Sequence, residues 1–293
     1  MLKIGIVFSG ALSKGAFHLG FIEAFNENLN GHKLKAVSGT SSGAVIAYAL
    51  ATNQIELTEN LWLEVNGKHA LSLWYKVVFR RLIKKNSKRL IKENDNVKLP
   101  LYITSFKVFP KFKFRYIKFE GKYTTSWNKI IEGSIGFPVV TGMPVFYKKG
   151  LYVDGGVVDN IPLNPLLKEN LDVIFVLHFD NKFNIRVEEE DEVIVINLVL
   201  STYADFKLKS FNYSTDYVLK MRAEGYRYSN EILKRLLRHN NIDDIRKEAV
   251  IIVKEENRVR KKKKSLDSIP TISNRVFRKR RDRDGNVVSV KDF

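Results

Sequence analysis

Two apolar segments of different character are joined by the turn Gly39-Thr40-Ser41-Ser42-Gly43, which constrains the fold more than any other part of the chain. Residues 34–38 indicate a short buried strand, and residues 44–50 form an apolar helical run. A Gly-x-Ser-x-Gly turn between a strand and a helix matches the nucleophile elbow, which exposes a serine hydroxyl. The two glycines permit the turn and a close approach of helix to strand. Ser41, at its centre, is therefore a better candidate nucleophile than Ser38 or Ser42.

A nucleophilic serine needs a base, and histidine is the usual one. In the chain order Ser, Asp, His, the candidates after Asp154 are His178 and His239. His178 ends the apolar run 172–177 and His239 lies in a basic helical stretch, but neither has a distinctive surrounding motif. A triad of the α/β-hydrolase kind with one of these histidines stays open as an alternative.

Asp154 is the other candidate base. It follows the short apolar segment 151–153 and precedes Gly155 and Gly156, which predicts a strand end where the backbone turns sharply. A free aspartate, with a pKa of about 3.9, takes a serine proton poorly, but burial in an apolar pocket raises that pKa. Asp159 is a rival acid, although we expect it to cap the next element together with Asn160.

Three motifs in this order resemble the patatin-like phospholipase family. They are a glycine-containing loop after the first strand, the Gly-x-Ser-x-Gly turn, and Asp154-Gly155-Gly156 with Asp159-Asn160-x-Pro162 behind it. The resemblance spans roughly residues 3–235. It implies a Ser41-Asp154 catalytic dyad without histidine, and an oxyanion hole of backbone N–H groups from Gly10, Ala11 and Leu12. The positions that match the supporting motif residues are Lys14, Gly15, Gly20, Gly39, Gly43, Gly155 and Gly156.

The oxyanion loop departs from the family pattern, which has three consecutive glycines where this chain has Gly10-Ala11-Leu12. Backbone donors need no particular side chain, so Ala11 and Leu12 can still donate hydrogen bonds. Leu12 tolerates a positive φ poorly, however. We therefore expect either a different loop path or a narrower acyl pocket.

The resemblance implies an α/β fold, a three-layer α/β/α sandwich with a mostly parallel central sheet. Alternating apolar strands and helical stretches support the same fold class. The predicted strands are 3–9, 34–38, 100–106, 112–119, 150–153, 172–179 and 193–199, and the predicted helices are 14–29, 42–52, 56–65, 72–92, 125–134, 163–168 and 205–237. We expect a hydrolase domain over residues 1–240 and a basic, partly flexible extension over 241–293.

The chain is strongly basic, with a net charge of +18. Residues 74–92 combine eight Lys or Arg residues with an apolar helical face and no acidic residue after position 75, the pattern of a helix at an anionic membrane surface. Residues 258–283 are a second basic candidate for that contact. Membrane phospholipid is the favoured partner, and nucleic acid is the alternative that so basic a chain also allows.

Function and location follow from these features. The resemblance implies a phospholipase or lysophospholipase that cleaves fatty-acyl esters and requires no cofactor or metal. A non-catalytic membrane- or nucleic-acid-binding protein on the same scaffold is the rival reading, motivated by Ala11-Leu12 and the basic tail. Residues 1–8 indicate a buried first strand rather than a signal segment, and no apolar stretch approaches 20 residues. We therefore expect a cytoplasmic protein, peripheral at the membrane.

Overall fold

The computed structural model describes residues 1–65, 73–136, 144–180, 186–190, 193–200 and 212–268. It contains one compact unit over Met1–Val253 and a second unit over Lys254–Phe293. The site and the sheet belong to the first unit. The division predicted at residue 240 stays a prediction. Three side chains beyond that position, Ile245, Ala249 and Ile252, are nevertheless buried in the core of the first unit.

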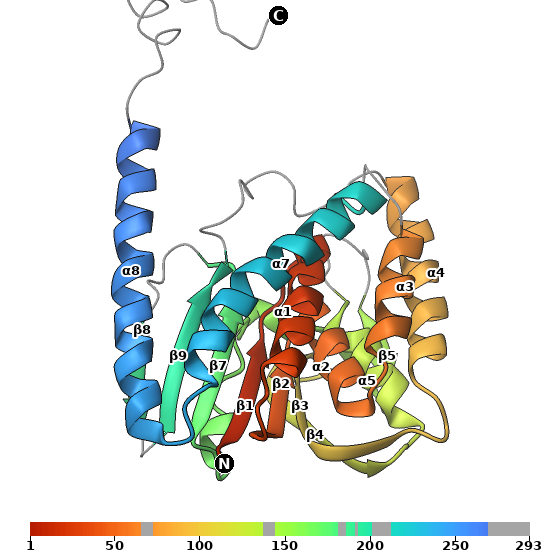
Figure 1. Ribbon diagram of the computed structural model, residues 1–293. Coiled ribbons are helices and arrows are strands. Elements are labelled where there is room, and N and C mark those ends of the chain that lie inside the picture. The colour runs from red at the N-terminus through yellow and green to blue at the C-terminus, as the bar shows by residue number, and fades with distance from the viewer. Residues whose placement is uncertain (66–72, 137–143, 181–185, 191–192, 201–211, 269–293) are drawn as a thin grey trace, which may run out of the picture. The chain divides into compact units, whose positions relative to one another are not determined.

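A mixed sheet forms the centre of this unit, with nine strands among the described residues (Figure 1). Its central part is parallel and runs in the order β3 (Asn96–Phe109), β2 (Lys33–Gly39), β1 (Lys3–Phe8), β7 (Val173–His178) and β9 (Val193–Val199). Every residue of β7 and β9 is buried, as parallel strands covered on both faces require. The predicted fold class, a mostly parallel sheet with flanking helices, is confirmed.

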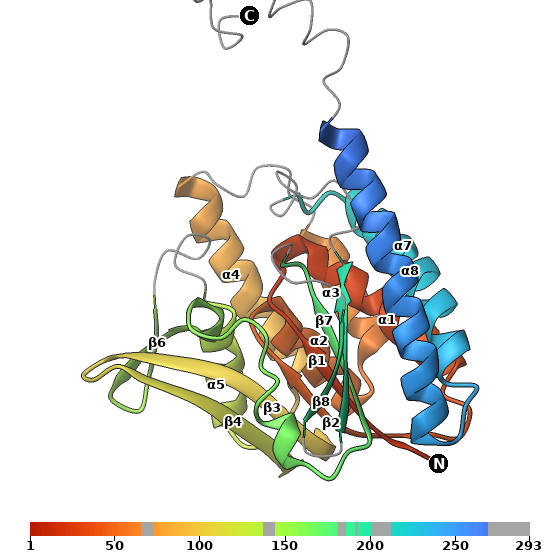
Figure 2. The same ribbon diagram turned by 90° about the vertical axis from the view of Figure 1, so that its left-hand side faces the viewer.

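Antiparallel strands extend the sheet at both edges. On one side β3 pairs with β4 (Lys113–Lys122) and with β6 (Gly150–Asp154), which in turn pairs with β5 (Val145–Tyr147). On the other side β8 (Arg186–Glu190) pairs with β9. The β3–β4 hairpin projects well beyond the neighbouring strands (Figure 2). β5 and β8 were absent from the sequence-based prediction, because three to five residues give little periodicity to detect.

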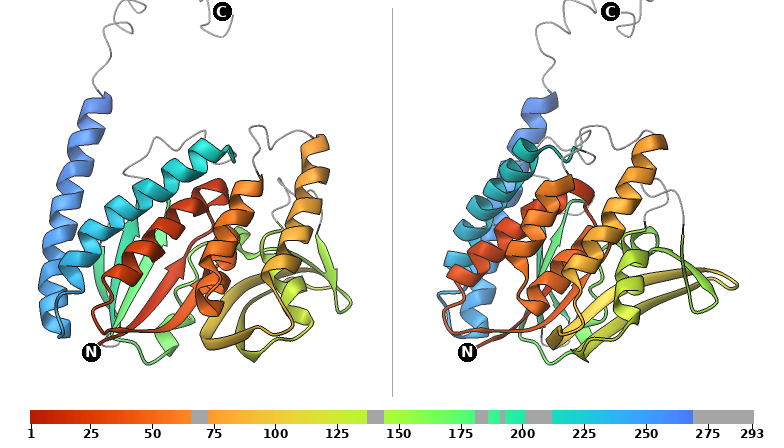
Figure 3. Two further views of the ribbon diagram at one scale, coloured as in Figure 1. Left: turned by 45° about the vertical axis from the view of Figure 1, so that its right-hand side comes forward. Right: turned by 90° about the vertical axis from the view of Figure 1, so that its right-hand side faces the viewer.

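Helices cover one face of the sheet and enclose the larger hydrophobic core (Figure 3). They are α1 (Ala16–Glu27), α2 (Ser42–Thr52), α3 (Ile55–Val65), α4 (Leu73–Leu90), α5 (Ser126–Ser134), α7 (Thr215–Leu236) and the first part of α8 (Ile242–Ser268). The segment after β6 contributes Leu166 and Leu171 to the smaller core on the other face. This segment contains two short 3₁₀ helices, Gly155–Val157 and Leu166–Lys168.

Two helix predictions differ from the structure. Residues 163–168 were expected to be helical but contain only the one-turn 3₁₀ helix, because Pro162 and Pro165 remove backbone donors there. α7 begins at Thr215, whereas a helix was predicted from 205; residues 201–211 lie outside the described residues. None of the helices in the described parts of the chain is long and apolar enough to cross a membrane.

Two glycines allow α1 and α7 to pack backbone against backbone. A Cβ atom at Gly20 would lie 2.0 Å from the Arg222 carbonyl oxygen, and one at Gly225 would lie 2.2 Å from the Phe17 carbonyl oxygen. Neither backbone can yield without separating the helices. This contact holds α7 against α1, and the loop that leads into α1 carries the candidate oxyanion residues.

We predict that Gly225→Ala lowers the free energy of unfolding by about 2–4 kcal/mol, since even one added methyl group overlaps the Phe17 carbonyl. Gly133→Ala in α5 is the matched control. The nearest atom to an added Cβ there is the Tyr152 Cβ at 3.4 Å, and alanine favours the helix, so stability should stay level or rise by up to about 1 kcal/mol. Urea unfolding of both variants measures the difference; equal effects would contradict the close helix contact.

Candidate active site

Ser41 occupies a strained turn between β2 and α2. Its backbone has φ 56° and ψ −128°, a conformation that a residue with a side chain rarely adopts. The flanking glycines make the turn possible: a Cβ at Gly39 would lie 2.3 Å from the Gly43 carbonyl oxygen, and one at Gly43 would lie 2.3 Å from the Phe8 carbonyl oxygen. The predicted elbow is present, and Ser41 is 8% exposed at the start of a helix.

Asp154 ends β6 and is 1% exposed. Its carboxyl group accepts a hydrogen bond from the Gly156 backbone N–H at 2.8 Å and another from the Ser41 side chain. Burial raises the pKa of Asp154 from 3.8 to about 6, while the two hydrogen bonds oppose this shift. The structure thus brings Ser41 and Asp154, which are far apart in the sequence, into direct contact, with the carboxyl poised to exchange a proton near neutral pH.

The loop after β1 approaches Ser41 closely. A Cβ at Gly10 would lie 2.9 Å from the Ser41 Cβ, and the Asn160 side-chain amide donates to the Gly10 carbonyl oxygen at 3.1 Å. Leu12 has φ 53°, so the chain follows a left-handed path here despite the bulky side chain. The Ala11 N–H donates to the Ser42 hydroxyl at 3.0 Å. Among the described residues, the Gly10 and Leu12 N–H groups have no hydrogen-bond acceptor.

Several polar residues near Ser41 and Asp154 were not selected from the sequence. The Ser134 hydroxyl accepts the Ser41 N–H at 3.3 Å, and the hydroxyls of Thr40 and Thr104 lie 2.7 Å apart. A Cβ at Gly155 would lie 2.6 Å from the Thr104 Cβ, so Thr104 packs directly under the turn that carries Asp154. These partners come from α5 and β3, and no local motif could have identified them.

Asp159 caps the segment that follows it, whereas Asn160, expected to share this cap, donates to the Gly10 carbonyl oxygen instead. One carboxylate oxygen accepts the Ile161 N–H at 3.0 Å and the other accepts the Tyr116 hydroxyl at 2.6 Å. Burial and this neighbouring carboxylate raise the pKa of Tyr116 to about 12. Asp159 therefore stabilises the loop after Asp154.

The histidines occupy structural positions in the described parts of the chain. His178 is buried at the end of β7 and accepts the Asp180 N–H at 3.3 Å, while His239 accepts a hydrogen bond from the Arg238 guanidinium. His32 bonds the backbone of Leu2 and Leu237. His18 is fully buried between the Phe8 and Phe179 rings, and burial lowers its pKa to about 3. His69 lies outside the described residues.

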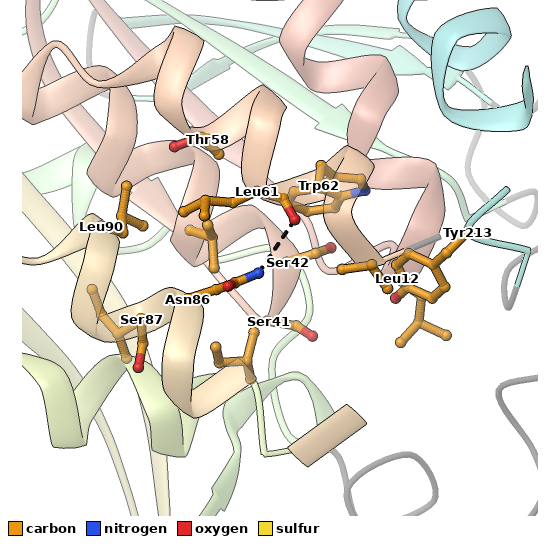
Figure 4. Close-up of a pocket in the computed structure, with 14 residues that line it drawn as sticks. Leu12, Ser41, Ser42, Thr58, Leu61, Trp62, Asn86, Ser87, Leu90 and Tyr213 are labelled. Atoms are coloured by element: carbon orange, nitrogen blue, oxygen red, sulfur yellow. Dashed lines mark hydrogen bonds between the residues drawn. The ribbon is translucent and has the colours of Figure 1, made fainter. Parts of the chain in front are cut away.

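Ser41 and Leu12 line both of two pockets that differ in polarity. The first is largely apolar and reaches between α2, α3, α4 and α5 (Figure 4). Its further lining residues are Ser42, Val45, Thr58, Leu61, Trp62, Val65, Asn86, Ser87, Leu90, Ile131, Ile135 and Tyr213. The second pocket is more polar than the first and contains Asp154, Lys14 and Asp180 beside the residue 10–12 loop.

Lys14 contributes the cation of the polar pocket. Its ammonium group lies 5.6 Å from the centre of the Phe179 ring, and burial lowers its pKa. The neighbouring Gly15 packs against Trp62, since a Cβ there would lie 2.8 Å from the indole. One turn thus contributes to both pockets: Lys14 lines the more polar pocket, and Gly15 packs against Trp62, which lines the apolar pocket. Within the described residues, no group of three or more His, Asp or Glu side chains is arranged to hold a metal ion.

A family model of patatin-like phospholipases matches residues 6–167, more than half of the chain, and this range includes the elbow, Asp154 and the loop after β1. The chain belongs to the patatin-like phospholipase family. The resemblance noted from three sequence motifs is thereby confirmed. No protein of established annotation matches the chain.

Two solved structures are similar to this chain only distantly. VipD from Legionella pneumophila is 12% identical, with a TM-score of 0.36, over 76% of this chain and 67% of VipD. The type III effector protein ExoU is 13% identical, with a TM-score of 0.34, over 99% of this chain and 67% of ExoU. Because the identities and TM-scores are this low, neither structure supports a conclusion about the site.

We predict that Asp154→Asn stabilises the protein near neutral pH. In the folded protein the pKa of Asp154 is raised above its unfolded value of 3.8. Above about pH 6 the group is ionised in both states, and its ionisation in the buried site lowers the free energy of unfolding. Below pH 3.8 the group is protonated in both states, and this penalty is absent. The shift corresponds to about 3 kcal/mol, and asparagine can keep both hydrogen bonds.

Urea unfolding of both proteins near pH 7 and near pH 4 checks this prediction. The stability advantage of Asp154→Asn should be about 2–3 kcal/mol at the higher pH and nearly vanish at the lower one. An equal difference at both values would contradict a buried, raised-pKa carboxyl.

Proposed function

We propose that this protein is a serine acyl hydrolase that cleaves fatty-acyl esters of phospholipids or lysophospholipids. The observation that carries the proposal is the Ser41 hydroxyl hydrogen-bonded to a buried carboxyl whose pKa is about 6. Membership of a family of lipid acyl hydrolases supports the same reaction class. The dyad itself and the choice of lipid are our inference.

In the proposed reaction, Ser41 Oγ attacks the acyl carbonyl carbon while the Asp154 carboxylate takes the hydroxyl proton. The protonated Asp154 then gives this proton to the departing alcohol oxygen, which leaves an acyl-enzyme on Ser41. A water molecule attacks the acyl carbon next, with Asp154 again taking the proton. Collapse of this second intermediate returns the proton to Ser41 Oγ and releases the fatty acid. A carboxyl with a pKa near 6 can serve in both directions near neutral pH.

The negative oxygen of the tetrahedral intermediate requires donors beside Ser41. We propose the Gly10 and Leu12 N–H groups, which are without acceptors in the described residues, as these donors. The Ala11 N–H is already engaged by Ser42, so its proposed part is to fix the loop rather than to bind the oxyanion. The positive end of α2 adds to the stabilisation of negative charge at Ser41.

The two pockets support an amphiphilic substrate. The apolar pocket beside Ser41 suits an acyl chain, and the polar pocket with Lys14 suits the alcohol part of an ester that carries a charged head group. Ser41 lies where the two meet, as the scissile bond between acyl chain and alcohol requires. Asn86, Ser87 and Leu90 of α4 line the apolar pocket, so at least this end of the basic 74–92 segment also serves the substrate site.

The two alternatives receive less support. A histidine triad would need an imidazole at the dyad, whereas the partners of the Asp154 carboxyl in the described structure are Ser41 and Gly156. A non-catalytic scaffold would not need a strained serine backbone beside a buried carboxyl, since both oppose folding.

We predict that Ser41→Ala and Asp154→Ala each reduce lysophospholipid and soluble-ester hydrolysis by at least about 10³-fold while the protein stays folded. Both residues act in one proton-transfer unit, so the double variant should be little worse than either single one. Release of fatty acid, with circular dichroism to check folding, measures the effect.

The control variant is His178→Ala, which should retain activity within about tenfold because no histidine acts in the dyad. A folded Ser41→Ala protein with most of its activity would refute the nucleophile. Loss of several orders of magnitude in His178→Ala would instead favour the triad.

We predict that kcat/KM for a soluble ester falls tenfold per pH unit below about pH 6 and is level above it. The active form carries ionised Asp154, so activity is lost as the pH drops through the pKa that burial has raised. If kcat/KM instead falls only near pH 4, where an ordinary carboxyl group titrates, the proposed buried environment of Asp154 is wrong.

A further inference from the structure

The edge of the sheet beyond Asp154 exposes an unusual number of aromatic side chains. Phe112 is 78% exposed, Phe146 is 66% exposed and Phe109 is 58% exposed. Phe109 and Phe112 lie at the tip of the projecting β3–β4 hairpin, and Phe146 lies in the neighbouring β5–β6 hairpin (Figure 2). Exposed rings gathered on adjacent hairpins are typical of a surface that contacts an apolar or interfacial partner.

Cations accompany these rings on the same two hairpins. Lys107, Lys111, Lys113, Arg115, Lys148 and Lys149 belong to the two hairpins, and the sequence has no acidic residue from Val97 to Phe119 or from Gly133 to Val153. In the part of the chain that the structure describes, none of these six cations forms an ion pair. We name this surface, residues 106–115 and 145–150, the hairpin patch.

The register of the hairpin separates its rings from its charges. Phe106 lies opposite Phe114, and Lys107 lies opposite Lys113, on the alternate face. The Phe106 ring stacks on Phe112 with centres 6.0 Å apart. An amphipathic tip of this kind can place rings among acyl chains while its cations remain near phosphates.

The hairpin patch is continuous with the proposed active site. β3 pairs with β2 up to Gly39, the first residue of the elbow, and then continues to Phe109. The hairpin tip therefore projects from the end of the parallel strands at which Ser41 lies. The strand residue Ser105 lies opposite Asp154 itself. Tyr116 links the hairpin to Asp159 at 2.6 Å, and the exposed Val157 and Val158 lie just before that residue.

From these observations we propose that the hairpin patch docks onto the surface of an anionic phospholipid bilayer and turns the Ser41 pocket toward it. The rings enter the interface and the six cations lie against lipid phosphates, each contact weakening with salt. The proposal rests on the proposed function for its purpose, but the docking itself does not depend on hydrolysis. It differs from the contact expected of residues 74–92, which stays a separate proposal.

Single-site labelling tests the insertion directly, because the chain has no cysteine. Phe112→Cys and Phe146→Cys, each in a Ser41→Ala background, carry an environment-sensitive fluorophore, and Ile251→Cys on α8 is the matched exposed apolar control. With vesicles of equal parts phosphatidylcholine and phosphatidylserine, the first two probes should shift to the blue and brighten, and the control should not. Probes at 112 and 146 that stay in water while the protein sediments with vesicles would overturn the proposal, and would leave an acidic protein as the candidate partner.

A second comparison uses binding strength. Phe109→Ser, Phe112→Ser and Phe146→Ser combined should weaken vesicle binding by at least about tenfold, since exposed rings that enter the interface supply much of the affinity. Lys111→Gln, Lys113→Gln and Lys149→Gln combined should weaken it at low salt more than Lys84→Gln, Lys85→Gln and Lys88→Gln, three lysines of α4 that are also exposed.

Hydrolysis of a small soluble ester should be unchanged in the hairpin variants made with Ser41 intact. Wild-type vesicle binding by both hairpin variants would overturn the docking proposal. Docking without any ester hydrolysis by the wild type would instead refute the proposed function and leave the docking surface standing.

Discussion

The buried hydrogen bond between the Ser41 hydroxyl and the Asp154 carboxyl is the interaction on which the rest of this site depends. Asp154 is 1% exposed, and burial disfavours the ionised form of its carboxyl group. The surrounding structure therefore has to keep this group in its buried position. The sheet does so by ending β6 at Asp154 and pairing that strand with β3. The Gly156 N–H and the Ser41 hydroxyl supply hydrogen bonds to it, without which the desolvated group would be far less favourable.

The same strands connect the chemistry to the surface. β2 ends at the elbow, whereas β3 continues past it into the exposed hairpin. The carboxyl ends of these strands thus bring together Ser41, Asp154 and an aromatic, cationic surface. The helices on the other side of Ser41 form the apolar pocket. In the proposed function, an ester approaches from a lipid surface and its acyl chain enters between α2, α3, α4 and α5.

The sequence predicted those features that local rules determine. The elbow follows from glycine spacing between a strand and a helix, and Asp154 from an apolar segment that ends in two glycines. The direct contact of Asp154 with Ser41 came only through the family resemblance, because chain order alone also allowed His178 or His239. Neither approach found Ser134 or Thr104, since their positions depend on how distant elements pack. The pairing of the Ala11 N–H with Ser42 was missed for the same reason.

The most direct test of this account is covalent labelling with a fluorophosphonate, followed by mass spectrometry of the peptides. In the proposed mechanism the Ser41 hydroxyl gives its proton to Asp154. We therefore expect a single adduct on Ser41, formed at least about 10²-fold more slowly in a folded Asp154→Asn protein and at the wild-type rate in His178→Ala. An adduct on another serine, or labelling of Ser41 that is indifferent to Asp154, would contradict the central claim that this buried carboxyl activates the nucleophile.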